Sequence, residues 1–268
     1  KVLKIYPDFP DRGNCFVSEM NLICKTHGKK EWHQLYNYPE IGISLVHTYL
    51  GKNNVLGQSI SLLPSLIFQK KKYTHWGMQT RIGMGFAYFN KPYGRFSNPT
   101  NYTIGSYLNN ITFVSVGIWK SLSDHFTATA GVSSFHFSNG HYQMPNVSID
   151  FPSVYVGLKY FQKNPKKYFR HDSIAYPLKK ILLNLKLSMG IHEFGSLAKP
   201  IGGPKYPTYH FLLYASKRYN YINNVHAGIA AGYYSDHYDY IIDQEVFSSR
   251  QRLKAFTAVA FIGHEFMI

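Results

Sequence analysis

The chain has 268 residues and a formal net charge of +15, and 17% of its residues are aromatic while only 16% are charged. No stretch approaches the roughly 20 consecutive apolar residues of a transmembrane helix, so the chain either is soluble or crosses a membrane as a closed barrel. The excess positive charge indicates either solvated loops or an anionic membrane surface as partner, and not nucleic acid, because the basic residues are scattered or lie in expected loops such as 70–72 and 163–167.

Residues 1–40 are predicted to form an irregular N-terminal segment outside the barrel, since Pro7, Pro10, Gly13 and both cysteines lie in this stretch. Cys15 and Cys24 are nine positions apart without a companion His/Cys motif, which argues against a zinc site. A small disulfide loop and two free thiols both remain open.

From residue 41 the sequence pattern changes to segments of mixed apolar and polar residues separated by turn-forming residues, which is typical of a barrel or sandwich. We predict that residues 41–268 form one barrel of about ten strands, or twelve if further strands follow. The expected strands lie near 42–50, 55–70, 74–90, 103–121, 125–139, 152–163, 178–194, 207–221, 226–241 and 252–267.

Alternation and strand length favour a transmembrane antiparallel up-and-down β-barrel over a soluble sandwich. Successive side chains of a strand point to opposite faces, and many of these segments reach the roughly 9–11 residues that cross a membrane. Aromatic residues also gather at segment ends, where the interfacial girdle of a barrel would lie. In segment 178–192 one parity holds the apolar residues Ile181, Leu183, Leu185, Leu187, Met189 and Ile191.

A polar cluster interrupts the lipid-facing side of segment 125–139. The alternate positions that are apolar earlier in this strand are occupied by His136 and Ser138 at its end. In the next strand, the corresponding apolar positions extend backward to Asp150. A hairpin would bring these three together in the arrangement of a hydrolase triad, in which a carboxylate orients a His and the His takes the Ser proton. Asn139 offers a side-chain amide as an oxyanion-hole donor.

The stretch His136-Phe-Ser-Asn139-Gly140, followed by Pro145-Asn146 and by Asp150 fourteen positions after the His, resembles the lipid A 3-O-deacylase (PagL) family. The upstream segment Gly83–Tyr88 is similar to the family's glycine-rich strand and Pro152–Tyr160 to the strand after the motif, so the resemblance covers roughly residues 40–165. The family's acidic residue is commonly Glu, and this chain has Asp150 in its place.

The resemblance implies that His136 is the general base, Ser138 the nucleophile, Asp150 the acid that orients the His, and Asn139 an oxyanion-hole donor. It implies an outer-membrane esterase of a bacterial cell, with lipid A or a related glycolipid as substrate and outer-membrane lipids as surroundings. No metal or cofactor is implied, and His141 is expected to be a loop residue.

Two other functions remain open on the sequence. The first is a non-enzymatic outer-membrane barrel, either a channel or a structural component of an envelope complex, since polar residues such as Gln79, Arg81 and Lys186 fall on the lumen parity. The second is a soluble lipid-binding β-protein. A homodimer is compatible with either membrane function.

Overall fold

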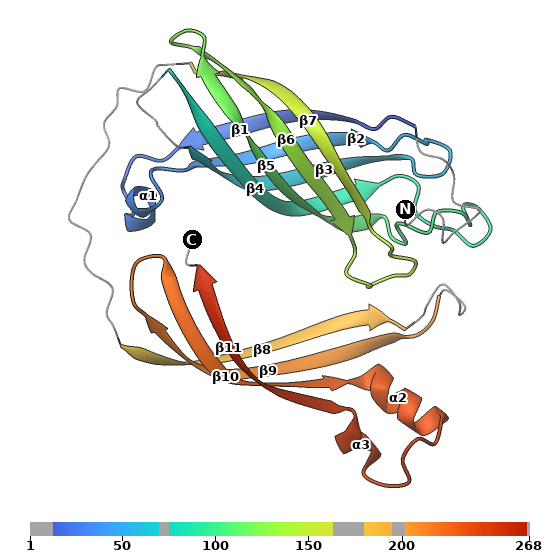
Figure 1. Ribbon diagram of the computed structural model, residues 1–268. Helices are drawn as coiled ribbons and strands as arrows, with labels where there is room; N and C mark the ends of the chain where they lie inside the picture. Colours follow the sequence, from blue (N-terminus) through green and yellow to red (C-terminus); the bar gives the residue numbers. More distant parts are fainter. Residues whose placement is uncertain (1–12, 70–74, 163–179, 195–201, 267–268) are drawn as a thin grey trace. The chain divides into compact units, whose positions relative to one another are not determined.

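The computed structural model describes residues 13–69, 75–162, 180–194 and 202–266. Contacts divide the chain into two units, Lys1–Asp172 and Ser173–Ile268. Each unit is an antiparallel sheet in which every strand pairs with its neighbours in the sequence (Figure 1). The predicted all-β, antiparallel, up-and-down fold class is therefore confirmed.

The first unit is a curled seven-stranded sheet with the strand order β1-β2-β3-β4-β5-β6-β7 (Figure 1). A short helix, α1 (Glu31–Leu35), lies between the first two strands in the sequence. The strands are β1 (Phe16–Lys25), β2 (Glu40–Tyr49), β3 (Gln58–Gln69), β4 (Trp76–Phe89), β5 (Leu108–Ser121), β6 (Phe126–Ser138) and β7 (Ile149–Tyr160).

The second unit is a four-stranded sheet, and the connection between its last two strands carries helices α2 (Ser235–Asp243) and α3 (Gln251–Lys254). Its strands are β8 (Ile181–Glu193), β9 (Lys205–Arg218), β10 (Asn223–Tyr234) and β11 (Phe256–Phe266). No helix within the described ranges is long and apolar enough to cross a membrane.

All ten predicted strands are present, with end points that shift by a few residues, but the prediction of an irregular segment over 1–40 is wrong for Phe16–Lys25. This strand pairs with β2 along its whole length. Its inward-facing positions include Glu19, Asn21 and Lys25, polar residues that are typical of loops in a sequence. Glu19 pairs with Arg81, Asn21 accepts from Ser44, and Lys25 lies over the ring of Phe161. Only the fold brings these partners close.

The predicted strand 226–241 is also too long, because its last residues belong to helix α2. The sequence Ser235-Asp-His-Tyr-Asp239 no longer alternates, and only Asp236 and Ile241 of the helix are buried. Of the two alternatives for the cysteines, the small disulfide loop is not formed, since no disulfide joins Cys15 to Cys24. The prediction that residues 41–268 close into one barrel remains a prediction.

The seven-stranded sheet has an inner face of buried side chains and an outer face of exposed ones. In β4 the exposed and buried positions alternate for most of its length, as the period-two pattern predicted. The inner face carries an apolar cluster formed by Val46, Leu50, Leu56, Leu63, Ala87, Phe89, Ile104, Ile111, Phe113, Phe135, Phe137, Ile149 and Phe151. Leu50, Leu56 and Ile104 belong to loops at the same end of the sheet as the β6–β7 loop. These loops therefore pack against the apolar cluster.

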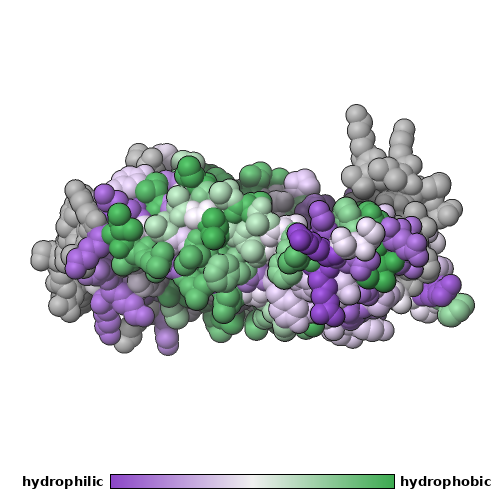
Figure 2. Space-filling view, turned by 90° about the horizontal axis from the view of Figure 1, so that it is seen from below, coloured by the Kyte–Doolittle hydropathy of each residue, from purple (hydrophilic) through white to green (hydrophobic). Residues whose placement is uncertain are grey.

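Large apolar side chains cover the outer face of the first sheet and are exposed along the strands of the second. In the second unit the predicted apolar parity of β8 is exposed, from Ile181 to Ile191, with Leu183 at 77% and Leu187 at 70%. The surface seen in Figure 2 carries a broad hydrophobic area bordered by hydrophilic residues. Exposed apolar area on this scale is typical of a surface that meets lipid or another apolar partner.

An ion pair on the inner face ties β1 to the rest of the first sheet. Arg81 Nη2 lies 2.6 Å from Glu19 Oε1, with side-chain exposures of 9% and 21%, and the guanidinium also donates to Ser44 and Ser65. Removing one member of such a pair leaves the other charge desolvated and unpaired.

We expect Arg81→Met to lower the free energy of unfolding by about 3 kcal/mol, because Glu19 keeps its charge without its partner. Urea titration of the refolded chain in lipid vesicles measures this. The double variant Glu19→Gln/Arg81→Met should recover part of the loss, since it leaves no lone charge. A double variant that is no more stable than the single one contradicts the assignment.

Candidate active site

Three neighbouring strands bring the predicted polar residues together at one end of the seven-stranded sheet. In the register of β5, β6 and β7, His136 lies between Thr112 and Asp150, and Asn110 lies beside Ser138. Since side chains alternate along a strand, His136 and Ser138 share the outer face of β6, while Phe135 and Phe137 point into the apolar cluster. The outward position predicted from the sequence is thus the one found.

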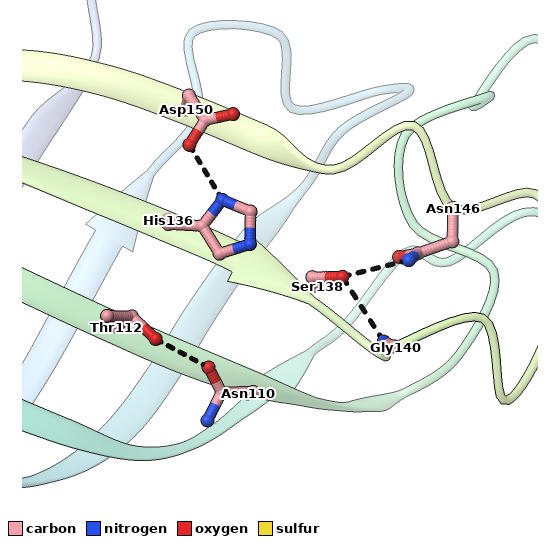
Figure 3. Close-up of polar contacts among 7 residues, drawn as sticks. All are labelled: Asn110, Thr112, His136, Ser138, Gly140, Asn146 and Asp150. Atoms are coloured by element: carbon pink, nitrogen blue, oxygen red, sulfur yellow. Dashed lines mark hydrogen bonds and ion pairs between the residues drawn. The ribbon is translucent and has the colours of Figure 1, made fainter. Parts of the chain in front are cut away.

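His136 and Asp150 are joined directly. The Nδ1 atom of His136 lies 2.7 Å from Oδ1 of Asp150 (Figure 3). They are cross-strand partners, and Cβ atoms of such partners are about 4.5–5.5 Å apart, so the short carboxylate of Asp150 reaches the ring. The pair is solvent-accessible, with side-chain exposures of 44% and 68%.

This hydrogen bond determines which ring nitrogen is available for chemistry. A carboxylate can only accept, so Nδ1 of His136 carries the donated hydrogen. In the neutral ring the other nitrogen, Nε2, then has a free lone pair and can take a proton. Asp150 therefore prepares His136 to act as a base at Nε2.

The Ser138 hydroxyl oxygen accepts two hydrogen bonds. The amide Nδ2 of Asn146 donates to Oγ at 2.8 Å, and the backbone N–H of Gly140 donates to it at 3.2 Å (Figure 3). Within the part of the chain that the structure describes, no hydrogen bond joins Ser138 to His136. Catalytic hydrogen bonds of this kind are often long before substrate binds.

Asn139 does not present its amide to Ser138, contrary to the sequence-based expectation. Its Nδ2 donates to Ser106 Oγ at 2.9 Å and to the carbonyl of Gln143 at 2.7 Å, which uses both amide hydrogens. Asn146 makes the contact with Ser138 that was predicted for Asn139. The Pro145-Asn146 pair was visible as part of the motif, but its role depends on how the loop folds back over β6.

A tight turn after β6 aims the Gly140 N–H at Ser138. Gly140 and His141 have φ values of 63° and 64°, in the left-handed region, and Tyr142 N donates to Asn139 O at 3.2 Å. Gly140 has no Cβ penalty in this conformation. His141 lies in this turn, as the sequence predicted, and contacts neither Ser138 nor Asp150 in the hydrogen bonds described.

Apolar side chains flank the polar cluster along the strands. Val114 on β5, Val132 on β6 and Val154 on β7 are 45%, 60% and 85% exposed on the outer face. These valines lie toward the middle of the strands, so hydrocarbon borders the polar cluster on that side. Within the described ranges, no three His, Cys, Asp or Glu side chains come close enough to hold a metal ion.

The sequence profile of the lipid A 3-O-deacylase (PagL) family matches residues 19–159, just over half of the chain. The chain belongs to this family. The match runs from within β1 to the penultimate residue of β7, so the family's sequence features coincide with the seven-stranded sheet and contain the whole His136/Ser138/Asp150 cluster. It also begins earlier than the resemblance read from the motif, because β1 is part of this sheet.

The second unit, Ser173–Ile268, lies outside the matched residues. Neither a curated protein nor a solved structure matches the chain. Membership of the PagL family therefore rests on the seven-stranded sheet and on the motif that it carries.

Proposed function

We propose that this member of the PagL family is an outer-membrane esterase that hydrolyses an ester-linked acyl chain of lipid A or a related glycolipid, with Ser138 as nucleophile. The observation that carries the proposal is the 2.7 Å contact between His136 and Asp150 beside a serine oxygen that accepts two N–H groups. All of these groups lie on or beside the apolar outer face of the sheet.

In the first step Nε2 of His136 takes the hydroxyl proton of Ser138, and Oγ attacks the acyl carbonyl carbon. Asp150 stabilises the imidazolium that forms, because its carboxylate already accepts the Nδ1 hydrogen. The carbonyl oxygen becomes negatively charged, and the N–H groups of Asn146 and Gly140 are the nearest donors for it.

In the second step the ester bond to the sugar oxygen breaks, and His136 gives its proton to that leaving oxygen. The product is an acyl ester of Ser138. Water then attacks this acyl ester while His136 takes a proton from the water. The fatty acid leaves as Ser138 Oγ regains a hydrogen from His136. No redox partner is needed, because each step moves only protons and one acyl group.

The substrate assignment rests on family membership and on the surroundings of the site. An outward-facing site that borders exposed valines suits an acyl chain that stays in the membrane. The net charge of +15 is consistent with attraction to a phosphate-bearing glycolipid. The outer membrane of a bacterial cell is the location that this family membership supports.

The test is labelling of the full chain, refolded in detergent micelles, with a long-chain alkyl phosphonofluoridate, followed by peptide mass spectrometry. We expect one phosphonyl group at Ser138 and parallel loss of fatty-acid release from lipid A. Fatty-acid release that survives complete labelling of Ser138 rules out this serine as the nucleophile. Absence of any release from lipid A rules out the substrate class.

Asp150→Asn should lower kcat about a hundredfold while KM changes little. The amide can offer its N–H to the ring, which favours the wrong tautomer of His136, and it cannot stabilise the imidazolium. The exposure of this pair makes the loss smaller than in a buried triad. Initial rates of fatty-acid release measure it, and a variant with wild-type kcat contradicts the role of Asp150.

A further inference from the structure

Behind the Ser138 site lies a chain of polar side chains that leads to Asn146, the amide donor of Ser138, and whose other members take no part in the chemistry described above. It runs from Asn109 at the start of β5, through Ser106 in the preceding loop, to Asn139 and then Asn146. Ser106, Asn109 and Asn146 are 7%, 3% and 7% exposed. Both ends of the Asn109 and Asn146 amides are paired, and paired buried polar groups hold a single arrangement, because any other leaves a desolvated group without a partner.

The direction of each hydrogen bond in this chain follows from groups that can only donate or only accept. The carbonyl of Ser106 must accept, so Asn109 turns its Nδ2 toward it, at 2.7 Å, and its Oδ1 toward Ser106 Oγ, at 3.0 Å. Ser106 Oγ also lies 2.9 Å from the carbonyl of Leu108. The Ser106 hydrogen is thus committed to these acceptors, and a lone pair of Oγ remains to accept from Asn139 at 2.9 Å.

The same reasoning determines the orientation of the Asn146 amide. The backbone N–H of Asn139 can only donate, and it lies 3.1 Å from Oδ1 of Asn146. Nδ2 of Asn146 must then face the other way, toward Ser138 Oγ at 2.8 Å. A flipped amide would place Nδ2 against the Asn139 N–H, donor against donor, and would remove the donor from Ser138.

The loop that precedes β5 and the loop between β6 and β7 are in direct contact beside Ser106. A Cβ added to Gly105 would lie 2.7 Å from the carbonyl oxygen of Gln143 and from the carbonyl carbon of Met144, so the backbones are in direct contact. Val147 N and Ser148 N also donate to Tyr102 O and Thr103 O, at 3.3 and 3.1 Å. Ser106 is the side chain in this junction that bonds to both Asn109 and Asn139.

We propose that Ser106 is a positioning residue for the hydrolytic site, acting through Asn139 to hold the Asn146 amide on Ser138. The inference rests on the proposed function of Ser138 and names a residue outside the His136-to-Asp150 motif. Ser106 touches neither the nucleophile nor a substrate. Its hydroxyl fixes Asn139, and the backbone of Asn139 in turn fixes which end of the Asn146 amide faces the reacting oxygen.

The test is a double-mutant cycle on kcat with the full chain in detergent micelles. Ser106→Ala should lower kcat roughly tenfold to a hundredfold with KM unchanged, because a small displacement of a transition-state donor costs rate and not substrate affinity. In the Asn146→Ala background the same substitution should have no further effect. Coupled residues give such non-additive cycles, and independent residues give additive ones.

Ser133→Ala is the matched control, since Ser133 is equally buried at 7% and loses one hydroxyl hydrogen bond, to Ser153 at 2.8 Å. It should leave kcat unchanged. Ser106→Thr, which keeps the hydroxyl, should recover most of the rate. The folded fraction of each variant is read from its shift in electrophoretic mobility on heating, and rates are compared per folded molecule.

An equal loss from Ser106→Ala in both backgrounds, or a wild-type kcat in Ser106→Ala, overturns the positioning role. A Ser106→Ala variant that only fails to fold, while Ser106→Thr folds with low kcat, overturns it as well. Failure of the proposed function is separate, because it shows as full activity in a chain whose Ser138 is completely phosphonylated.

Discussion

Replacing Ser138 with alanine is expected to lower the rate of fatty-acid release from lipid A by about 10⁴-fold or more, with the fold intact. The substitution removes the only atom that forms the acyl ester, so the remaining groups can at best assist a slow attack by water. The hydroxyl is half-buried at the end of β6 and not part of the apolar cluster, so its loss should cost little stability.

Ser134→Ala is the matched control for this experiment. Ser134 lies on the same outer face of β6, four residues before Ser138, but it pairs with Val114 and Pro152 instead of the loop donors. Rates are measured per folded molecule in mixed micelles of detergent and lipid A. Comparable losses in both variants, or retained activity in Ser138→Ala, would mean that Ser138 is not the nucleophile.

Asn146→Ala should produce the next largest effect, a loss of about 10²–10³-fold in kcat with little change in KM. This is the typical cost of removing one donor that stabilises the oxyanion of the transition state. The amide is 2.8 Å from Ser138 Oγ, whereas the amide of Asn139 is committed to Ser106 and Gln143. The prediction therefore separates the two asparagines of the motif.

Asn110→Ala is the matched control for proximity alone. Asn110 pairs with Ser138 in the β5–β6 register, but its amide donates to the carbonyl of Gly85 and its Oδ1 accepts from Thr112. Its kcat should stay at the wild-type level. If Asn146→Ala retains wild-type kcat, the Gly140 N–H and groups of the substrate must stabilise the oxyanion without it.

The sequence predicted much of this protein because strand patterns are local. Alternation at period two gave ten of the eleven described strands, and the apolar parity of β6 and β7 correctly put His136, Ser138 and Asp150 on the outer face. The fourteen-residue spacing from His136 to Asp150 then suggested the hydrolase family, and the family profile confirms that membership. Each of these features can be read within one strand or one hairpin.

Tertiary structure alone decided the features that depend on partners far along the chain. Strand β1 carries Glu19 inward, which is acceptable only because Arg81 on β4 lies 2.6 Å away. The register of β6 against β7 decided that a carboxylate as short as Asp150 reaches His136. The identity of the donor at Ser138 required the packing of two loops, which ties Asn139 to Ser106 and leaves Asn146 to face the nucleophile. A single sequence contains both asparagines but not the direction in which either amide points, because that direction is set by hydrogen bonds between segments that meet only in the folded protein.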